Sequence, residues 1–336
     1  MKKLLVCIIM LLSMFMLVGC NEKEKPFDIL QKGEVVNVGI IKYVTVPALD
    51  SAEKGIIDAL ADAGFTDGQN IKIIKYNPEA NASTLSQMVK TAVKDCDVIF
   101  AIATPVVTQL KEEIEKSGIN VPVFFTAVTA PVEDKLVNSK DNPGEFITGT
   151  SDMNPVADQL SLIESFNKDG QKYEAKKIGY LYTATESNSI IQLNLLKEQA
   201  SKMGFEVVAK SITNANDLKD ATDALVAEKV DAVYLPTDNV VNAAAKTVTD
   251  ITNEAKIPTI CAEEGYLSNG GLITLSINYE KLGVLTGEMA VKYFKGEVET
   301  LNELPVGQIT EFELHINETI AAELGITFTG LDKYNK

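Results

Sequence analysis

The residues with the clearest chemical potential follow an apolar run in the second half of the chain. Val230 to Leu235 is rich in β-branched and aromatic residues and predicts a buried strand, and a helical pattern follows it at once. Asp238 and Asn239 therefore lie where the carboxyl end of a strand meets the start of a helix. In open α/β sheets, ligands bind at that edge. For this pair taken alone, helix capping is the alternative.

An earlier stretch has the same form. Asp97 to Pro105 also begins with an acidic residue, continues as an apolar strand and ends in Thr and Pro. A strand pattern at 38–43 returns at 178–182, about 140 residues later. The matching continues at 71–76 with 205–210 and at 120–124 with 256–260. Helical patterns alternate with these strands, so the sequence predicts two similar doubly wound α/β lobes whose strand ends face a common cleft.

A small ligand that carries both an ammonium group and a carboxylate would need acceptors for the first and donors for the second. We expect Asp238 to be the first acceptor, with Glu186, Glu263 or Glu264 as helpers. All 31 basic residues are Lys, so no guanidinium group is available to clamp the carboxylate. Hydroxyl groups and helix-terminal N–H groups are expected to hold it instead.

Several hydroxyl and amide residues lie at predicted strand ends. On the first lobe or at its exit these are Thr104, Thr126 and Ser151. On the second lobe, Ser187, Asn188 and Ser189 follow Glu186 at the start of a helix and could reach the same cleft. Simple N-capping explains those three equally well, and Thr104 before Pro105 also fits a helix start.

Ring-bearing residues gather at the same edge. They are Tyr43, Phe125, Tyr182, Tyr266 and Tyr279. An aromatic ligand would use such side chains as walls, whereas packing in the core is the alternative for each. We expect Tyr43 and Tyr279 to be the two that contact the ligand.

The first residues predict an export signal. Met1 to Lys3 is basic, Leu4 to Val18 is apolar, and Leu17 to Cys20 resembles the bacterial lipobox, whose cysteine becomes the lipidated first residue. We therefore expect a signal peptide over 1–20, a lipid-modified (palmitate-bearing) Cys20 and a flexible stalk over 21–33. The mature protein would be tethered to the outer face of the cell membrane.

Composition excludes several classes of function. The formal charge of −16 argues against nucleic acid as a partner. Cys96 and Cys261 fall in different predicted lobes, so we expect buried free thiols instead of a disulfide. The single His, His315, lies in a terminal strand pattern, and no metal-ligand spacing, nucleophile elbow or P-loop occurs. The sequence thus predicts a protein that is not an enzyme and needs neither metal nor cofactor.

Motifs at these strand ends resemble one known family. They are Pro47-Ala48-Leu49-Asp50, Ala101-Ile102-Ala103-Thr104-Pro105, Phe125-Thr126-Ala127-Val128, Thr148-Gly149-Thr150-Ser151-Asp152, Pro236-Thr237-Asp238-Asn239 and Asn278-Tyr279. Over residues 35 to 328 the chain resembles the ABC-transporter substrate-binding lipoproteins, whose better-known members bind tryptophan, tyrosine or phenylalanine. Many relatives carry His where Val46 stands and Asp where Asn278 stands. The resemblance places Ala127 and Asn278 among the ligand-binding candidates.

The resemblance implies a type I periplasmic-binding fold with three crossovers and a closing hinge. We expect a first lobe of 34–150 plus 277–304 and a second lobe of 151–276 plus 305–332. The implied function is a monomeric, lipid-anchored receptor, on a Gram-positive cell surface, that delivers an aromatic amino acid to an ABC permease. The alternatives are an adhesin-like lipoprotein with a host-surface partner, and a receptor for another solute such as a sugar or nucleoside.

Overall fold

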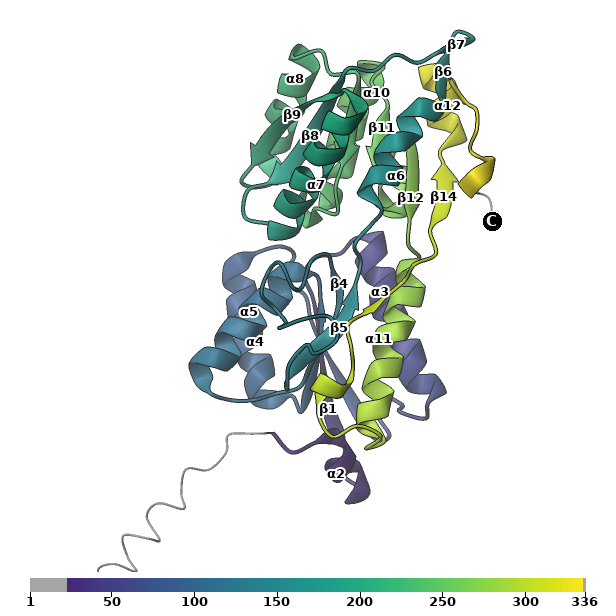
Figure 1. The fold of residues 1–336 in the computed structure, drawn as a ribbon. Coiled ribbons are helices and arrows are strands. Elements are labelled where there is room, and N and C mark those ends of the chain that lie inside the picture. Colours follow the sequence, from purple (N-terminus) through teal and green to yellow (C-terminus); the bar gives the residue numbers. More distant parts are fainter. Residues whose placement is uncertain (1–22, 335–336) are drawn as a thin grey trace, which may run out of the picture.

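The computed structural model describes residues 23–334, which form two lobes that lie end to end in Figure 1. Each lobe contains a six-stranded sheet, with the strand orders β13-β5-β4-β3-β1-β2 and β14-β12-β11-β10-β8-β9. All pairings in these sheets are parallel except β12 with β14. The two orders match strand for strand, which confirms the predicted repeat and the predicted α/β class.

The strands are short and mostly buried. The first sheet contains β1 (Val36–Lys42), β2 (Ile71–Tyr76), β3 (Val98–Ile102), β4 (Val123–Val128), β5 (Ile147–Ser151) and β13 (Gly307–Gln308). The second contains β8 (Lys177–Thr183), β9 (Glu206–Ile212), β10 (Ala232–Leu235), β11 (Thr259–Cys261), β12 (Ile273–Ser276) and β14 (Glu313–Ile316). A small antiparallel sheet joins β6 (Phe166–Lys168), β7 (Gln171–Lys172) and β15 (Ile326–Phe328). Every residue of β3 and β10 is buried, as expected for parallel strands covered on both faces.

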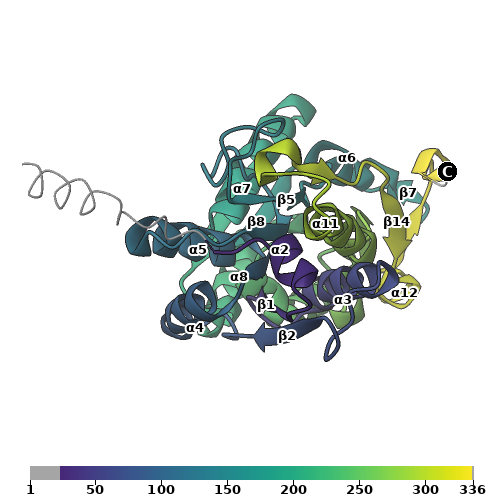
Figure 2. The same ribbon diagram turned by 90° about the horizontal axis from the view of Figure 1, so that it is seen from below.

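Helices cover both faces of each sheet. The first lobe carries α2 (Pro26–Gln31), α3 (Pro47–Asp62), α4 (Ala82–Asp95), α5 (Thr104–Ser117) and α11 (Tyr279–Phe294). The second carries α6 (Val156–Ser161), α7 (Ser187–Met203), α8 (Leu218–Ala227), α9 (Asn239–Ala243), α10 (Ala245–Glu254) and α12 (Glu318–Leu324). Figure 2 shows α4 and α5 on one side of the first sheet and α3 and α11 on the other.

The helix boundaries follow local sequence signals. Helix α5 has Pro105 in its first turn and ends at Gly118, whose φ of 68° is left-handed. Helix α7 ends in the same way at Gly204, with φ 78°. The single helix predicted over 239–255 is instead two helices, because Ala244 adopts the non-helical angles φ −118° and ψ 27°.

Three segments connect the lobes, at residues 152–155, 277–278 and 309–312. The third lies later than the predicted boundary after residue 304. Gly307 and Gln308 pair with Thr150 and Ser151 of the first sheet, so residues 305–308 continue the first lobe. A two-residue strand is too short for hydrophobic periodicity to reveal.

The predicted stalk is partly wrong. Within it, Pro26–Gln31 forms α2, and Ile29 is 6% exposed in the first-lobe core. Lys25 also pairs with Glu299, with 2.8 Å between Nζ and Oε2. The segment reads as polar in sequence, but its apolar side chains bind a surface formed by the distant helix α11. The predicted signal peptide and Cys20 lie outside the described residues.

Helices α3 and α11 pack backbone against backbone. A Cβ atom at Gly55 would lie 2.2 Å from the carbonyl oxygen of Glu280, and one at Gly283 would lie 2.0 Å from that of Ala52. Only glycine permits this approach. Because α11 starts directly after the second crossover, the contact fixes the start of α3 relative to the hinge.

Cys96 and Cys261 are buried free thiols in different lobes, as predicted. Burial raises the pKa of both groups, that of Cys261 to about 12. Both therefore pack as small apolar side chains, because the reactive thiolate form is disfavoured.

Candidate functional site

A small cavity, with a volume of about 20 Å³, lies between the lobes. The first lobe and the crossovers supply Val46, Ala48, Leu49, Ala127, Thr129, Asp152 and Tyr279 to its wall. The second lobe supplies Asn188, Thr237, Asp238, Asn239, Asn242 and Glu263. These residues follow the carboxyl ends of parallel strands or begin the next helix, which is the edge where open α/β sheets bind ligands.

The first-lobe wall has an apolar part, which contains the start of α3. The N–H groups in the first turn of a helix have no intrahelical acceptor. Val46, at the N-cap position, provides no side-chain acceptor for them, and Pro47 follows it. The positive end of this 16-residue helix therefore faces the cavity beside Ala48 and Leu49.

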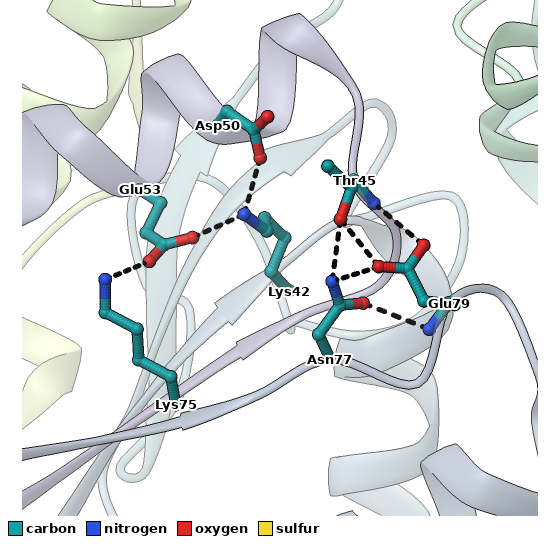
Figure 3. A network of polar contacts seen from close by, with 7 residues as sticks. All are labelled: Lys42, Thr45, Asp50, Glu53, Lys75, Asn77 and Glu79. Atoms are coloured by element: carbon teal, nitrogen blue, oxygen red, sulfur yellow. Dashed lines mark hydrogen bonds and ion pairs between the residues drawn. The ribbon is translucent and has the colours of Figure 1, made fainter.

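A polar network holds the loop before α3 in place (Figure 3). The Thr45 hydroxyl donates to Glu79 Oε1 at 2.6 Å, and Asn77 Nδ2 donates to Thr45 Oγ1 at 2.9 Å. Lys42 then ties the end of β1 to α3 through Asp50 at 2.5 Å and Glu53 at 2.7 Å, and Lys75 reaches the other oxygen of Glu53 at 2.7 Å. The network surrounds the segment that presents Val46 to the cavity.

Ala127 enters the cavity wall through an irregular strand. The pairing of β4 with β5 shifts register between Phe125 and Val128, and Ala127 adopts a left-handed φ of 54°. A Cβ atom at Gly149 would lie 1.9 Å from the carbonyl oxygen of Phe125, so only glycine fits beside the bulge. Bulges and strained backbone are concentrated at functional sites.

The second-lobe wall consists largely of hydrogen-bond acceptors. Asn188 Nδ2 donates to the Thr237 carbonyl oxygen at 2.5 Å, and Asn242 Nδ2 donates to Glu263. The Oδ1 atom of each amide has no partner, although Asn188 is 2% exposed and Asn242 is 6% exposed. A ligand that donates hydrogen bonds would satisfy both atoms.

Asp238 has no free acceptor position. Its carboxylate accepts hydrogen bonds from the Thr183 N–H and hydroxyl at 2.6 and 2.7 Å, and from the Ser189 hydroxyl at 2.6 Å. It also caps α9 through the N–H groups of Val240 and Val241 at 3.1 and 2.9 Å. Five donors exhaust the lone-pair positions of a carboxylate. Its expected role as first ammonium acceptor is therefore not supported, and helix capping, the alternative, describes what it does here.

Glu186 lies directly behind this wall. One oxygen accepts from Asn239 N and Nδ2 at 3.0 and 2.8 Å, and from Asn188 Nδ2 at 3.2 Å. The other oxygen, Oε1, is buried without a partner. Burial first, and then the charge of Asp238, raises the pKa of Glu186 to about 8.

Two further carboxyl groups line the cavity. Asp152 follows β5 and accepts from the hydroxyls of Thr129 and Tyr279, both at 2.9 Å. Glu263 follows β11 and accepts from Asn242 and from the Gly265 N–H. Burial raises the pKa of Asp152 despite these hydrogen bonds, and it raises the pKa of Glu263 to about 7.

The cleft is closed. The Thr129 and Thr237 hydroxyl oxygens, on opposite lobes, lie 3.2 Å apart. Burial raises the pKa of Asp134 on the first lobe, and a hydrogen bond from Ser187 on the second lobe partly offsets this shift.

The structure brings six of the predicted residues to the cavity: Ala127, Asn188, Asp238, Asn239, Glu263 and Tyr279. Asn278 instead caps α11 and lines an adjacent groove. The remaining predicted residues do not line this cavity: Tyr43, Thr104, Phe125, Thr126, Ser151, Glu186 and Ser187. Of the other candidates, Tyr266 is fully buried and its hydroxyl donates to the Pro236 carbonyl oxygen at 2.7 Å.

Contacts within the first lobe explain why several predicted residues do not line the cavity. The Tyr43 hydroxyl donates to the Ala80 carbonyl oxygen at 3.4 Å, and its pKa is raised to about 12 by burial and then by nearby carboxylates. Phe125 is fully buried in the first-lobe core. The Ser151 hydroxyl donates to the Thr129 carbonyl oxygen at 2.9 Å, so it positions Thr129.

Sequence reasoning left several wall residues out of the site: Val46, Ala48, Leu49, Thr129, Asp152, Thr237 and Asn242. Most of them stand in or next to the motifs that carried the resemblance, so that signal was available. Asn242 is the exception, since it lies one turn into a helix and only the fold turns it toward the cleft.

Two further observations concern the part of the chain that the structure describes. Between residues 23 and 334, no helix combines the length and apolar character needed to cross a membrane. In the same range, no three His, Cys, Asp or Glu side chains are grouped so that they could hold a metal ion.

Comparisons with known proteins agree with this geometry. The family model for ABC transporter substrate binding proteins matches residues 37–330. A tyrosine-binding protein from Clostridioides difficile (strain R20291) is 38% identical over 328 residues, which cover 94% of this chain and 90% of the relative.

Solved structures show the same fold. A domain from Streptococcus pneumonia in complex with L-Trp has a TM-score of 0.81 at 32% identity and covers 88% of this chain and 96% of its own. A ligand-free, open substrate-binding protein with adhesive properties from Clostridium difficile has a TM-score of 0.64 at 38% identity and the same coverage.

The lower TM-score therefore belongs to the more similar sequence. That relative is described as ligand-free and open, whereas the cleft of the present structure is closed. Taken with the family match over most of its length, these findings show that the chain belongs to the ABC transporter substrate-binding proteins.

Proposed function

We propose that this protein is the extracytoplasmic receptor of an ABC importer and encloses one aromatic α-amino acid between its lobes, with tyrosine as the first candidate. The observation that carries the proposal is the opposition of two chemically different walls across one cavity. An acceptor-rich second-lobe wall faces the uncapped start of α3 on the first lobe.

The two walls match the two charges of an amino acid. Asn188 Oδ1 and Asn242 Oδ1 are buried acceptors without partners, and Glu263 lies beside them. These atoms would receive the N–H donors of an ammonium group. The carboxylate would lie against the first turn of α3, because helix N-termini bind anions through free N–H groups.

The side chain of the ligand would contact the apolar part of the first-lobe wall. Val46, Ala48, Leu49 and Ala127 supply that surface, and Tyr279 adds one ring. Because the cavity has a volume of about 20 Å³ in this closed arrangement, the lobes would part slightly to hold an amino acid. The relatives support the aromatic class, since one is named for tyrosine and another holds L-Trp.

Delivery to a permease and anchoring at Cys20 belong to the same proposal. The pattern around Cys20 supports a lipid anchor that would hold a monomeric receptor at the outer face of the membrane. Globomycin sensitivity of processing, together with a Cys20→Ser variant that is released from cells, would test the anchor separately from ligand binding.

Native mass spectrometry followed by titration calorimetry tests the ligand. The titrations use tyrosine, phenylalanine, tryptophan and leucine, with N-acetyltyrosine and tyrosine methyl ester as derivatives that block one charge each. We expect one aromatic amino acid to bind and both blocked forms to lose affinity. A protein that binds none of the amino acids, or that copurifies with a sugar or nucleoside, would refute the proposal.

An Asn242→Leu variant tests whether the ligand binds in this cavity, because it removes an unpartnered acceptor from the cavity wall. It should weaken binding about tenfold. Asn253→Leu is the matched control, since Asn253 Oδ1 also lacks a partner but lies outside the cavity wall. Equal effects of the two substitutions would remove Asn242 from the site.

Adhesion is a second candidate function, favoured by one observation. The open structure at 38% identity belongs to a substrate-binding protein with adhesive properties. A deletion strain carrying the Asn242→Leu form would separate the two activities. If adhesion uses a surface outside the cleft, this strain should attach to host cells as fully as the wild type does. Attachment no better than that of the deletion strain would contradict an adhesive surface outside the cleft.

A further inference from the structure

Two buried carboxyl groups approach the cavity from opposite sides of the hinge. The hydroxyls of Thr129 and Tyr279 hold Asp152 on the first-lobe side, with 2.9 Å for each hydrogen bond. Glu263 is held by the second lobe alone, through Asn242 and through the Gly265 N–H at 2.9 Å. Asp152 is 3% exposed and Glu263 is 2% exposed. Closing the lobes therefore brings two fixed acidic groups to one cavity.

No cationic side chain in the wall compensates their charge. Among the described residues that line the cavity, none is Lys or His. The other titratable groups that face this region are acids, phenols and one thiol: Glu186, Asp238, Cys261, Glu264 and Tyr266 from the second lobe, with Tyr43 and Tyr279 from the first. The wall also offers the unpartnered acceptors Asn188 Oδ1 and Asn242 Oδ1, whose orientation is fixed because each amide nitrogen already donates.

Electrostatics then opposes closure of the empty cleft. Bringing like charges together while removing water costs free energy, which is why carboxyl groups in such positions retain protons. The groups in the closed cleft behave accordingly, since the charge of Asp152 adds to burial in raising the pKa of Glu263 to about 7. A primary ammonium group would supply both the missing positive charge and three hydrogen-bond donors.

We propose that the ammonium group of the ligand is the counter-ion that permits closure. Asp152, in the first crossover and held by the first lobe, and Glu263, held by the second lobe, form the charge pair that makes closure depend on it. The inference rests on the proposed amino-acid ligand and adds to it a reason for specificity. A ligand of the right shape without an ammonium group leaves the acidic pair uncompensated, so the lobes stay apart. Protons can replace the ammonium group at low pH.

Small-angle X-ray scattering of the full domain measures closure through the radius of gyration. Without ligand, the wild-type protein should be open at pH ~8.5 and more compact at pH ~5.5, on either side of the titration of Glu263. Tyrosine should close it at pH ~8.5. 3-(4-Hydroxyphenyl)propionate, which lacks only the ammonium group, should leave it open.

Asp152→Asn combined with Glu263→Gln removes both charges and keeps the size of both side chains. This variant should close without ligand at pH ~8.5 and should bind tyrosine at least about tenfold more weakly than the wild type. Glu198→Gln is the control, because Glu198 is a surface acid of α7 with a 60% exposed side chain and lies outside the cavity wall. The control should open and close as the wild type does. A double variant that stays open without ligand would overturn the inference.

A second measurement needs no variant. Calorimetry of tyrosine binding to the wild type, repeated in buffers of different ionisation enthalpy near pH ~7, should detect proton release when the ammonium group arrives. Binding without proton release would overturn the inference while leaving the proposed function intact. A wild type that binds no amino acid would instead refute the proposed function, so the two failures are distinguishable.

Discussion

The hydroxyl oxygens of Thr129 and Thr237 lie 3.2 Å apart and join the two lobes directly across the cleft. Each is held by its own lobe. Thr129 also donates to Asp152 at 2.9 Å, and the Thr237 N–H donates to Gln192 Oε1 at 3.3 Å. A chain of hydrogen bonds therefore connects the first crossover, next to β5, with helix α7 of the second lobe.

Thr129→Val should favour the open form. It removes the hydroxyl while keeping the side-chain shape, and a neutral hydrogen bond contributes about 1 kcal/mol, so ligand affinity should fall about fivefold. Thr237→Val should have a similar effect, and the double variant should lose less than the sum of the two. Calorimetry with the natural ligand measures all three variants.

Thr91→Val is the control for this pair. The Thr91 hydroxyl bonds only within its own helix, to the Gln87 carbonyl oxygen at 3.1 Å, far from the cleft. Additive effects of the two cleft substitutions would show that the hydroxyls do not interact in the closed form.

Asp238→Asn should unfold the protein more readily. The Asn side chain would replace one carboxylate oxygen with an NH₂ group, so some of the five donors would lose their acceptor. Because Asp238 is 0% exposed, water could not take its place. We expect a loss of about 3 kcal/mol in the free energy of unfolding, measured with urea. Asp217→Asn is the comparison, since Asp217 also accepts two backbone N–H groups, at 2.9 and 3.3 Å, but is partly exposed. A stable Asp238→Asn variant with much weaker ligand binding would restore Asp238 as a ligand contact.

Glu186 should make the stability of the ligand-free protein depend on pH. Its pKa rises from an ordinary 4.5 to about 8 in the folded protein, mainly because of burial and then because of the charge of Asp238. The native state therefore binds a proton that the unfolded state has released. This contribution to stability is complete below pH 4.5 and is lost as the pH rises through about 8.

Thermal unfolding over that pH range tests this expectation. Glu186→Gln cannot titrate, so its melting temperature should fall less steeply with pH than that of the wild type. Some dependence should persist, because the pKa of Glu263 is raised in the same direction. Glu198→Gln is the control, since Glu198 lies on the surface in an ion pair with Lys202 at 2.7 Å. Parallel pH profiles for the wild type and Glu186→Gln would contradict the assignment.

The contact between α3 and α11 predicts a graded effect of added methyl groups. Gly283→Ala would place Cβ 2.0 Å from a backbone oxygen of Ala52, whereas Gly287→Ala would place it 2.6 Å from the Ala59 side chain. Overpacking typically costs about 1–3 kcal/mol and more when the backbone must move. Urea unfolding should therefore show the larger loss for Gly283→Ala. Ala59→Gly should partly rescue Gly287→Ala but not Gly283→Ala, and rescue of both would contradict backbone contact at Gly283.

The sequence by itself determined the elements, their repetition and the edge where the site lies. Periodicity and capping signals are local, so the alternation of strands and helices could be predicted, and parallel strands with facing carboxyl ends imply a cleft. The Pro-Thr-Asp-Asn stretch was predicted to lie at that cleft, and Asp238 and Asn239 line the cavity. The three crossovers were also expected, although β13 lay beyond the reach of any periodic signal.

Only the tertiary structure decided which side chain does what at that edge. Asp238 is committed to five donors from its own lobe, and this depends on Thr183 and Ser189, which are distant in the chain. Tyr43 does not line the cavity, because its hydroxyl donates a hydrogen bond to the Ala80 carbonyl oxygen instead. Whether a polar group is free for a ligand depends on competition with partners brought together by folding. That competition, together with the burial that raises the pKa of Asp152 and Glu263, is a property of the packed molecule.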